Sequence, residues 1–227
     1  KNLVIIILAI YAIKKLKLLE LSGLSKHIKL QNKFLILIPL YLVVIGVLFL
    51  LGTDLSSISA IDFILLSLAM LSVGFVEEFI FRAILQSVLL KKYSQRKNGI
   101  LISIFLPAAL FGGIHLFGLD MSNIAASIGQ VVYALFIGAA FGAILLKTNK
   151  IVPLAIIHGL IDLVFTINTL LDDGATAGEL EQQNIGQAIG GMLLVLPLFI
   201  AGLFIIRKIS RASVQEKIVL SREIKHS

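Results

Sequence analysis

Six ionisable side chains lie in stretches of the sequence that are otherwise apolar. A carboxylate beside an imidazole can take a proton from water, and a second imidazole with a polar neighbour can stabilise the oxyanion of a tetrahedral intermediate. The set therefore predicts a hydrolase. Glutamate and histidine also bind zinc, so one divalent metal, held by Glu77, His115 and His158, is an open alternative. The six residues are Glu77, Glu78, Arg82, His115, His158 and Asp162.

The spacing of these residues places several of them on common helix faces. Glu78 and Arg82 are four residues apart, and Gln86 follows after four more, so the three share one side of a helix. His158 and Asp162 are also four residues apart. Because ionisable groups within a membrane normally face the bundle interior and pair there, we expect these faces to meet.

Each pair also has a simpler structural interpretation. Glu78 and Arg82 can form an intrahelical salt bridge that allows both to be buried. A buried His115 can bridge two helices, and His158 with Asp162 can be a hydrogen-bonded pair. A purely structural network of this size would be costly inside a membrane, which favours a functional site.

The elements that hold these residues are predicted to be transmembrane helices. The chain has 227 residues, of which 58% are hydrophobic and 15% charged, with a mean hydropathy of +1.02 and no cysteine. This composition excludes a soluble enzyme, a disordered chain and a disulfide-linked domain. Each apolar stretch is expected to be helical, because backbone groups in hydrocarbon must be paired within the segment. The stretches are 3–13, 34–51, 61–90, 100–117, 124–146, 151–171 and 188–206.

The fold class is therefore all-α, a single transmembrane domain over 1–227 with about seven spans and the active site inside the bundle. The first stretch is too short to span, and because the chain opens at Lys1 we expect an upstream piece to be missing. Gly138 and Gly142 have the spacing that lets helices approach closely. The 16-residue loop 172–187 is expected to be flexible.

The basic residues predict the orientation of the bundle. All lysines and arginines except Lys1 and Arg82 fall in alternate loops and in the C-terminal tail. The other loops contain acids and no basic residue, so the positive-inside rule places the basic loops and the C-terminus in the cytoplasm. The net charge of +7 is thereby explained by topology, and nucleic acid is not an expected partner. The predicted location is a bacterial plasma membrane.

Three motifs on separate spans resemble those of a known family. Glu77 to Arg82 reads Glu-Glu-x-x-x-Arg, Phe111 to His115 reads Phe-x-x-x-His, and His158 to Asp162 resembles His-x-x-x-Asn. The set resembles the CAAX prenyl protease and bacteriocin-processing family, also called the Abi family, over about residues 61–171. The sequence lacks the His-Glu-x-x-His and Gly-x-Ser-x-Gly patterns of other protease classes.

The resemblance implies an intramembrane endopeptidase that cuts a membrane-associated or lipidated protein or peptide. By the family's pattern, Glu77 activates water with help from His115, while His158 and Asp162 stabilise the oxyanion. Glu78 and Arg82 orient the cluster. In bacteria the family acts in peptide processing or bacteriocin self-immunity. Metal-dependent and metal-free mechanisms both remain open.

Two features depart from a simple transfer of these roles. Asp162 stands where the prenyl proteases have asparagine, and an ionised carboxylate cannot donate to an oxyanion. It would have to be protonated, orient His158 or bind metal. The other feature is depth: His115 and His158 meet only if the helix of His115 starts further into the cytoplasm or tilts.

We expect the site to open toward the cytoplasm. Two other functions fit the same residues. One is a non-enzymatic bacteriocin immunity or binding protein, and the other is a proton-coupled transporter, since buried acids and histidines also relay protons.

Overall fold

The computed structural model describes residues 1–118, 124–171 and 185–223, and this part of the chain is helical without any strand. The all-α prediction is confirmed. Most of the predicted flexible loop, residues 172–184, lies outside the described residues. The α-helices are α1 (Asn2–Lys15), α2 (Leu40–Phe49), α3 (Ala60–Glu78), α4 (Ser87–Tyr93), α5 (Gly99–Ile114), α6 (Ile124–Thr148), α7 (Val152–Thr166), α8 (Ile185–Arg207) and α9 (Arg211–Glu223).

Four helical segments of the described chain are long and apolar enough to cross a membrane: Ala60–Tyr93, Gly99–Phe117, Ser127–Thr148 and Ile189–Arg207. The predicted stretches 34–51 and 151–171 contain shorter apolar helices, Lys33–Phe49 and Val152–Thr166, and a 3-10 turn, Ile167–Leu170, follows the second. At about 1.5 Å per residue, the 15 residues of α7 cover about 22 Å, less than the thickness of a hydrocarbon core.

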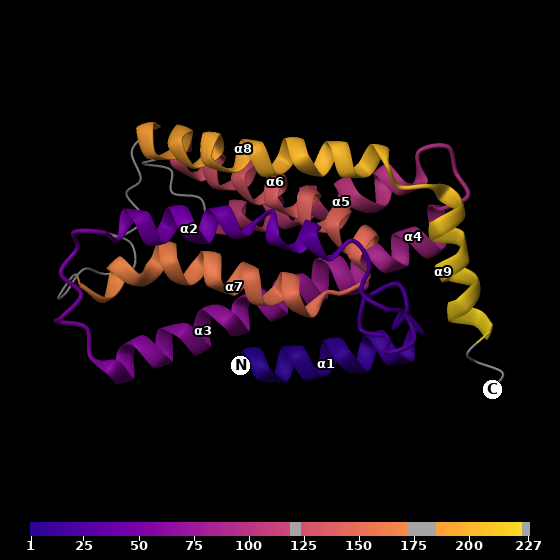
Figure 1. Cartoon of the computed structure of the whole chain (residues 1–227), viewed down its shortest axis with the longest axis horizontal. Helices are drawn as coiled ribbons and strands as arrows, with labels where there is room; N and C mark the ends of the chain where they lie inside the picture. The colour runs from indigo at the N-terminus through magenta and orange to yellow at the C-terminus, as the bar shows by residue number, and fades with distance from the viewer. Residues whose placement is uncertain (119–123, 172–184, 224–227) are drawn as a thin grey trace.

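The helices pack as a bundle in which α7 lies between α2 and α3, and α6 lies between α5 and α8 (Figure 1). α1 lies along the second half of the rod that α3 begins. The main core joins α1, α2, α6, α7 and α8, and buries Leu42, Phe141 and Leu154. All helices except α9 run roughly along one axis, and α9 crosses the bundle at one end (Figure 1).

We call this end the basic end, because α1 ends there and the α4–α5 connection, the α6–α7 connection and α9 all gather around it (Figure 1). The α2–α3 connection lies at the opposite end. At the basic end the last carbonyls of α6 receive hydrogen bonds from distant segments. Lys217 Nζ donates to Leu146 O at 2.6 Å, and Asn32 Nδ2 donates to Lys147 O at 3.0 Å. These contacts satisfy groups that a helix leaves unpaired at its C-terminus.

Candidate active site

The first motif lies where α3 changes its helical geometry. After Glu78 the chain continues as a π-helix, Phe79–Gln86, before α4 completes a 34-residue rod. π-helical turns are rare and occur frequently at functional sites. This segment buries Arg82 and Gln86, each 1% exposed. Gln86 Nε2 donates to Gly142 O at 3.0 Å, so the end of the π-helix is fixed against α6.

Arg82 is buried between its acidic partner, an aromatic ring and a glycine. Its Nη1 lies 2.9 Å from Glu78 Oε1, and its guanidinium carbon lies 4.4 Å from the centroid of the Phe111 ring. A Cβ atom at Gly138 would lie 3.0 Å from Arg82 Nη2, so a glycine there makes room for the guanidinium. Gly142 makes similar room for the Gln86 amide. The two glycines therefore make room for polar side chains, in addition to allowing the helices to approach closely.

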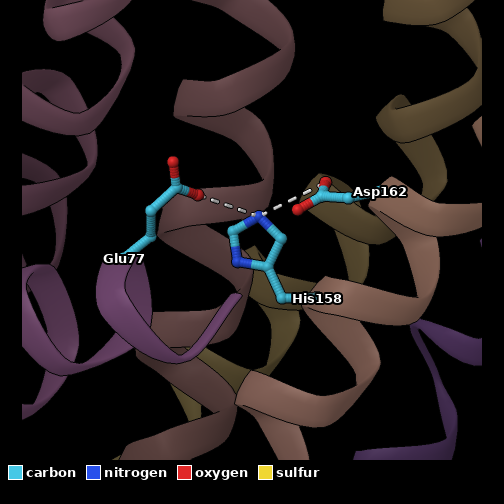
Figure 2. A group of neighbouring side chains, drawn as sticks. All are labelled: Glu77, His158 and Asp162. Carbon is cyan, nitrogen blue, oxygen red and sulfur yellow. Dashed lines mark ion pairs between the residues drawn. The ribbon is translucent and has the colours of Figure 1, made fainter. Parts of the chain in front are cut away.

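His158 is the centre of the site. Its Nδ1 lies 2.9 Å from Glu78 Oε1, and its Nε2 lies 3.4 Å from Glu77 Oε2 and 3.9 Å from Asp162 Oδ1 (Figure 2). One imidazole thus brings together residues of α3 and α7 that are about 80 positions apart in the chain. The rings of Phe111 and Phe141 meet the imidazole edge-on, with centroids 5.9 and 5.7 Å away, and fix its plane.

The two ring nitrogens of His158 have different roles. Glu78 is already an ion-pair partner of Arg82, so its carboxylate accepts a hydrogen bond from the Nδ1–H of His158. In a neutral ring Nε2 would then carry a lone pair facing the oxygens of Glu77 and Asp162. That arrangement is repulsive unless a proton on Nε2 or a bound cation lies among the three atoms.

The charge of the cluster leads to the same conclusion. Three carboxylates and one guanidinium leave two negative charges uncompensated when His158 is neutral, and one when it is protonated. Buried charge of one sign is costly unless a counter-ion or proton offsets it. The site therefore attracts positive charge to the region between Glu77, His158 and Asp162.

A close helix crossing brings the two halves of the cluster into contact. A Cβ atom at Gly74 of α3 would lie 2.5 Å from the carbonyl oxygen of Ala155 and 2.6 Å from the amide nitrogen of Gly159, both in α7. The two backbones touch at this point, one turn or less from Glu77 and His158. The sequence alone does not predict this crossing, because the two glycines lie on different helices and form no motif.

His115 lies beside the cluster, at the end of α5. Its ring is 5.5 Å from that of Phe111, which also contacts His158. Phe111 lies twelve residues after the start of α5, and His158 six residues after the start of α7, so α5 begins about 9 Å further toward the basic end. The helix that precedes His115 therefore starts further toward the basic end than the helix of His158, which is one of the two conditions under which the two histidines can meet.

The metal-ligand group of the described residues is Glu77, His158 and Asp162, whose ligand atoms all lie within 4.8 Å of one another. His115, which is predicted to be a ligand with Glu77 and His158, is not a member of this group, whereas Asp162, for which metal binding is one of three predicted roles, is a member. Imidazole and carboxylate ligands suit zinc, and a carboxylate on the second ring nitrogen, as Glu78 supplies here, is the usual way to orient a metal-binding histidine. The donor set therefore fits a divalent cation.

Comparison with protein-family models independently supports the family resemblance of the three motifs. Residues 59–164 match the family model described as type II CAAX prenyl endopeptidase Rce1-like. The match contains all three motifs and ends two residues after Asp162. No match to the chain was found among curated proteins or among solved structures.

Proposed function

Because residues 59–164 match the family model of type II CAAX prenyl endopeptidases, we propose that this protein is an intramembrane endopeptidase in which Glu77 activates the attacking water. The observation that carries the proposal is the meeting of Glu77 and His158, from two motifs on different helices, at the partly exposed edge of a buried ion-pair network. The substrate is a peptide bond of a membrane-associated protein or peptide.

The chemistry follows from the positions of the side chains. The Glu77 carboxylate takes a proton from water while the water oxygen adds to the peptide carbonyl. The Nε2–H of a protonated His158 donates to the oxyanion that forms. Glu77 then returns the proton to the amine nitrogen as the carbon–nitrogen bond breaks. A free carboxyl group and a free amine are the products.

The remaining motif residues act through His158. Glu78 holds Nδ1 and so aims Nε2 toward Glu77, while Arg82 and the ring of Phe111 hold Glu78 in place. An ionised Asp162 beside Nε2 would favour the protonated ring, so in this proposal Asp162 supports the oxyanion through His158 and does not itself donate to it. His115 lies beyond Phe111, where it can contact the leaving segment of the substrate.

A metal-dependent form of the same reaction is the second candidate, and the donor geometry of Glu77, His158 and Asp162 favours it. A divalent cation bound there would polarise the peptide carbonyl and ease the deprotonation of water. In that form Glu78 orients His158 through Nδ1, as before. Chelation followed by metal replacement, with activity and bound metal both measured, separates the two mechanisms.

We also propose a bacterial plasma-membrane location with the basic end in the cytoplasm. The support is the distribution of lysine and arginine, which gathers on α9 and on the connections at the basic end. Immunity by binding without cleavage, and proton-coupled transport, are the alternatives. The family match over residues 59–164 favours neither of them.

The deciding experiment compares new protein termini in membranes expressing the wild type or Glu77→Gln at equal abundance. Glu216→Gln on the exposed side of α9 is the matched control, because it makes the same chemical change outside the site. Termini present with the wild type and Glu216→Gln, and missing with Glu77→Gln, are expected. Identical termini in all three membranes would overturn the proposal.

A further inference from the structure

The polar groups of the site are exposed on one side only. On α7, Asp162 is 28% exposed, whereas His158, nearer the basic end, is 5% exposed. On the rod, Glu77 is 20% exposed, whereas Arg82, nearer the basic end, is 1% exposed. Directly after α5, the partly exposed His115 lies further from the basic end than the buried Phe111 of that helix.

The side of the cluster that faces the basic end is filled. On the rod, Gln86 and Ser87 are buried, and Leu90 has no exposed surface. α5 and α7 contribute Ile104 and Leu154 at the same depth, both with no exposed surface. Close-packed interiors of this kind leave no path for a peptide without displacement of the packed helices.

A further layer closes the basic end. Val214 and Ile218 of α9 are each 1% exposed and pack in one cluster with Leu21, Leu90 and Ile104. Arg211 donates to the carbonyl of Lys97 in the α4–α5 connection, which secures the start of α9 across the end of the bundle. In Figure 1, α9 lies across this end.

Among the described residues, the opposite half of the bundle exposes large apolar side chains. The first half of α3 exposes Ile61, Leu65 and Leu68 by 58–70%, and Phe117, two residues after His115, is 94% exposed. Surfaces of this kind suit the hydrocarbon of a membrane or an apolar peptide within it.

From these observations we infer that the substrate reaches Glu77 and His158 from the half of the membrane opposite the basic end. Its class is an apolar peptide segment inserted in that half, rather than a polar tail entering from the aqueous phase at the basic end. With the basic end in the cytoplasm, as proposed above, this route differs from the expected opening toward the cytoplasm. The substrate class rests on the proposed function, whereas the route rests on the packing alone.

The natural absence of cysteine allows a direct test with single-cysteine variants. Asp162→Cys and His115→Cys report on the site, and Ser87→Cys reports on the packed side. Ser57→Cys in the α2–α3 connection and Ala212→Cys in α9 mark the two faces, since both positions are exposed. A positively charged, membrane-impermeant methanethiosulfonate is applied to sealed vesicles of either orientation, and size-exclusion chromatography verifies that each variant folds.

We expect Asp162→Cys and His115→Cys to react at least about tenfold faster from the Ser57 face than from the Ala212 face, a ratio that corresponds to about 1.4 kcal/mol. Ser87→Cys should be protected from both faces. Faster reaction from the Ala212 face, or no reaction of either site variant from any face, would overturn the route.

The same variants separate this inference from the proposed function. Labelling from the Ser57 face together with unchanged termini in Glu77→Gln membranes would retain the route and reject the protease. If cleavage is found, cuts confined to polar tails at the basic end would reject the substrate class. Cuts within apolar segments in the opposite half would support it.

Discussion

Glu78 carries two contacts with one oxygen, to Arg82 and to His158, and this sharing links the stability of the site to its chemistry. Oε1 lies 2.9 Å from Arg82 Nη1 and 2.9 Å from His158 Nδ1. A change at Glu78 therefore leaves a buried guanidinium without its counter-ion and releases the imidazole. The two consequences can be separated by a second substitution.

We expect Glu78→Gln to lower the free energy of unfolding by about 3–5 kcal/mol, because it leaves the Arg82 charge buried and uncompensated. The double variant Glu78→Gln/Arg82→Met should regain most of this stability, since no buried charge is left unpaired. Its activity should stay low, because Nδ1 of His158 no longer meets a carboxylate. Thermal unfolding in detergent and peptide cleavage are the two measurements. Recovery of both in the double variant would contradict a positioning role for Glu78.

Substitutions of Asp162 distinguish the metal-free mechanism from the metal-dependent one. In the metal-free mechanism we expect Asp162→Asn to retain activity within a few-fold, because the amide can donate to the oxyanion that His158 also contacts. Asp162→Ala should be about 10²-fold less active, the magnitude typical of a lost oxyanion donor or its support. Cleavage rates and bound metal are measured for both variants. Loss of activity and of metal in Asp162→Asn would instead identify the carboxylate as a ligand.

At the scale of the elements, the crossing of α3 and α7 sets the distance between the first and third motifs. Gly74 and Gly159 allow the two backbones to touch, and Glu77 and His158 follow from this contact. The π-helix Phe79–Gln86 then turns Arg82 and Gln86 toward α5 and α6. The spacing of four residues was correctly interpreted as a shared polar face, although an ordinary α-helix was assumed there.

We expect Gly74→Ala to lower the free energy of unfolding by about 1–3 kcal/mol and to reduce cleavage, because the new Cβ would lie 2.5 Å from a backbone oxygen of α7. Unfolding in detergent and cleavage rate are measured together. Gly190→Ala in α8 is the matched control. Its Cβ would meet no atom within 4 Å, so it should be neutral or stabilising. Equal effects of the two substitutions would contradict the importance of the crossing.

At the scale of the whole molecule, charge and packing are arranged along the bundle axis. The basic end has a packed interior and is covered by α9, and the site lies between this packed half and the apolar opposite half. Lys217 fixes α9 to the end of α6 through the carbonyl of Leu146. Burial, and to a smaller extent the nearby charge of Lys147, lower the pKa of Lys217 to about 8.

This pKa predicts that α9 binds the bundle more tightly in alkaline solution. Between pH 8 and the ordinary value of 10.5, Lys217 binds fewer protons when α9 is docked than when it is detached, so docking strengthens as pH rises through this interval. We expect trypsin cleavage at Arg211 to slow from pH 7.5 to 9.5, after correction with a free peptide of the α9 sequence. Lys217→Met should abolish this trend. A wild-type rate that does not fall would contradict the prediction.

The sequence by itself determined the helical class and the approximate helix positions, and it predicted the residues of the candidate site. Apolar runs near the length of a bilayer must be helical, and six ionisable residues within them must find partners, so composition and spacing were sufficient. The family match over residues 59–164 agrees with the three motifs.

Only the tertiary structure decided which partners meet and from which side. Ligand distances between α3 and α7 depend on a backbone contact between two glycines that are 85 positions apart, which no local pattern encodes. For the same reason Asp162, rather than His115, lies with Glu77 and His158. The packing of the basic half depends on contacts of Val214 and Ile218 in α9 with Leu21, Leu90 and Ile104. These residues are far apart in the sequence, so hydropathy alone does not predict that they meet.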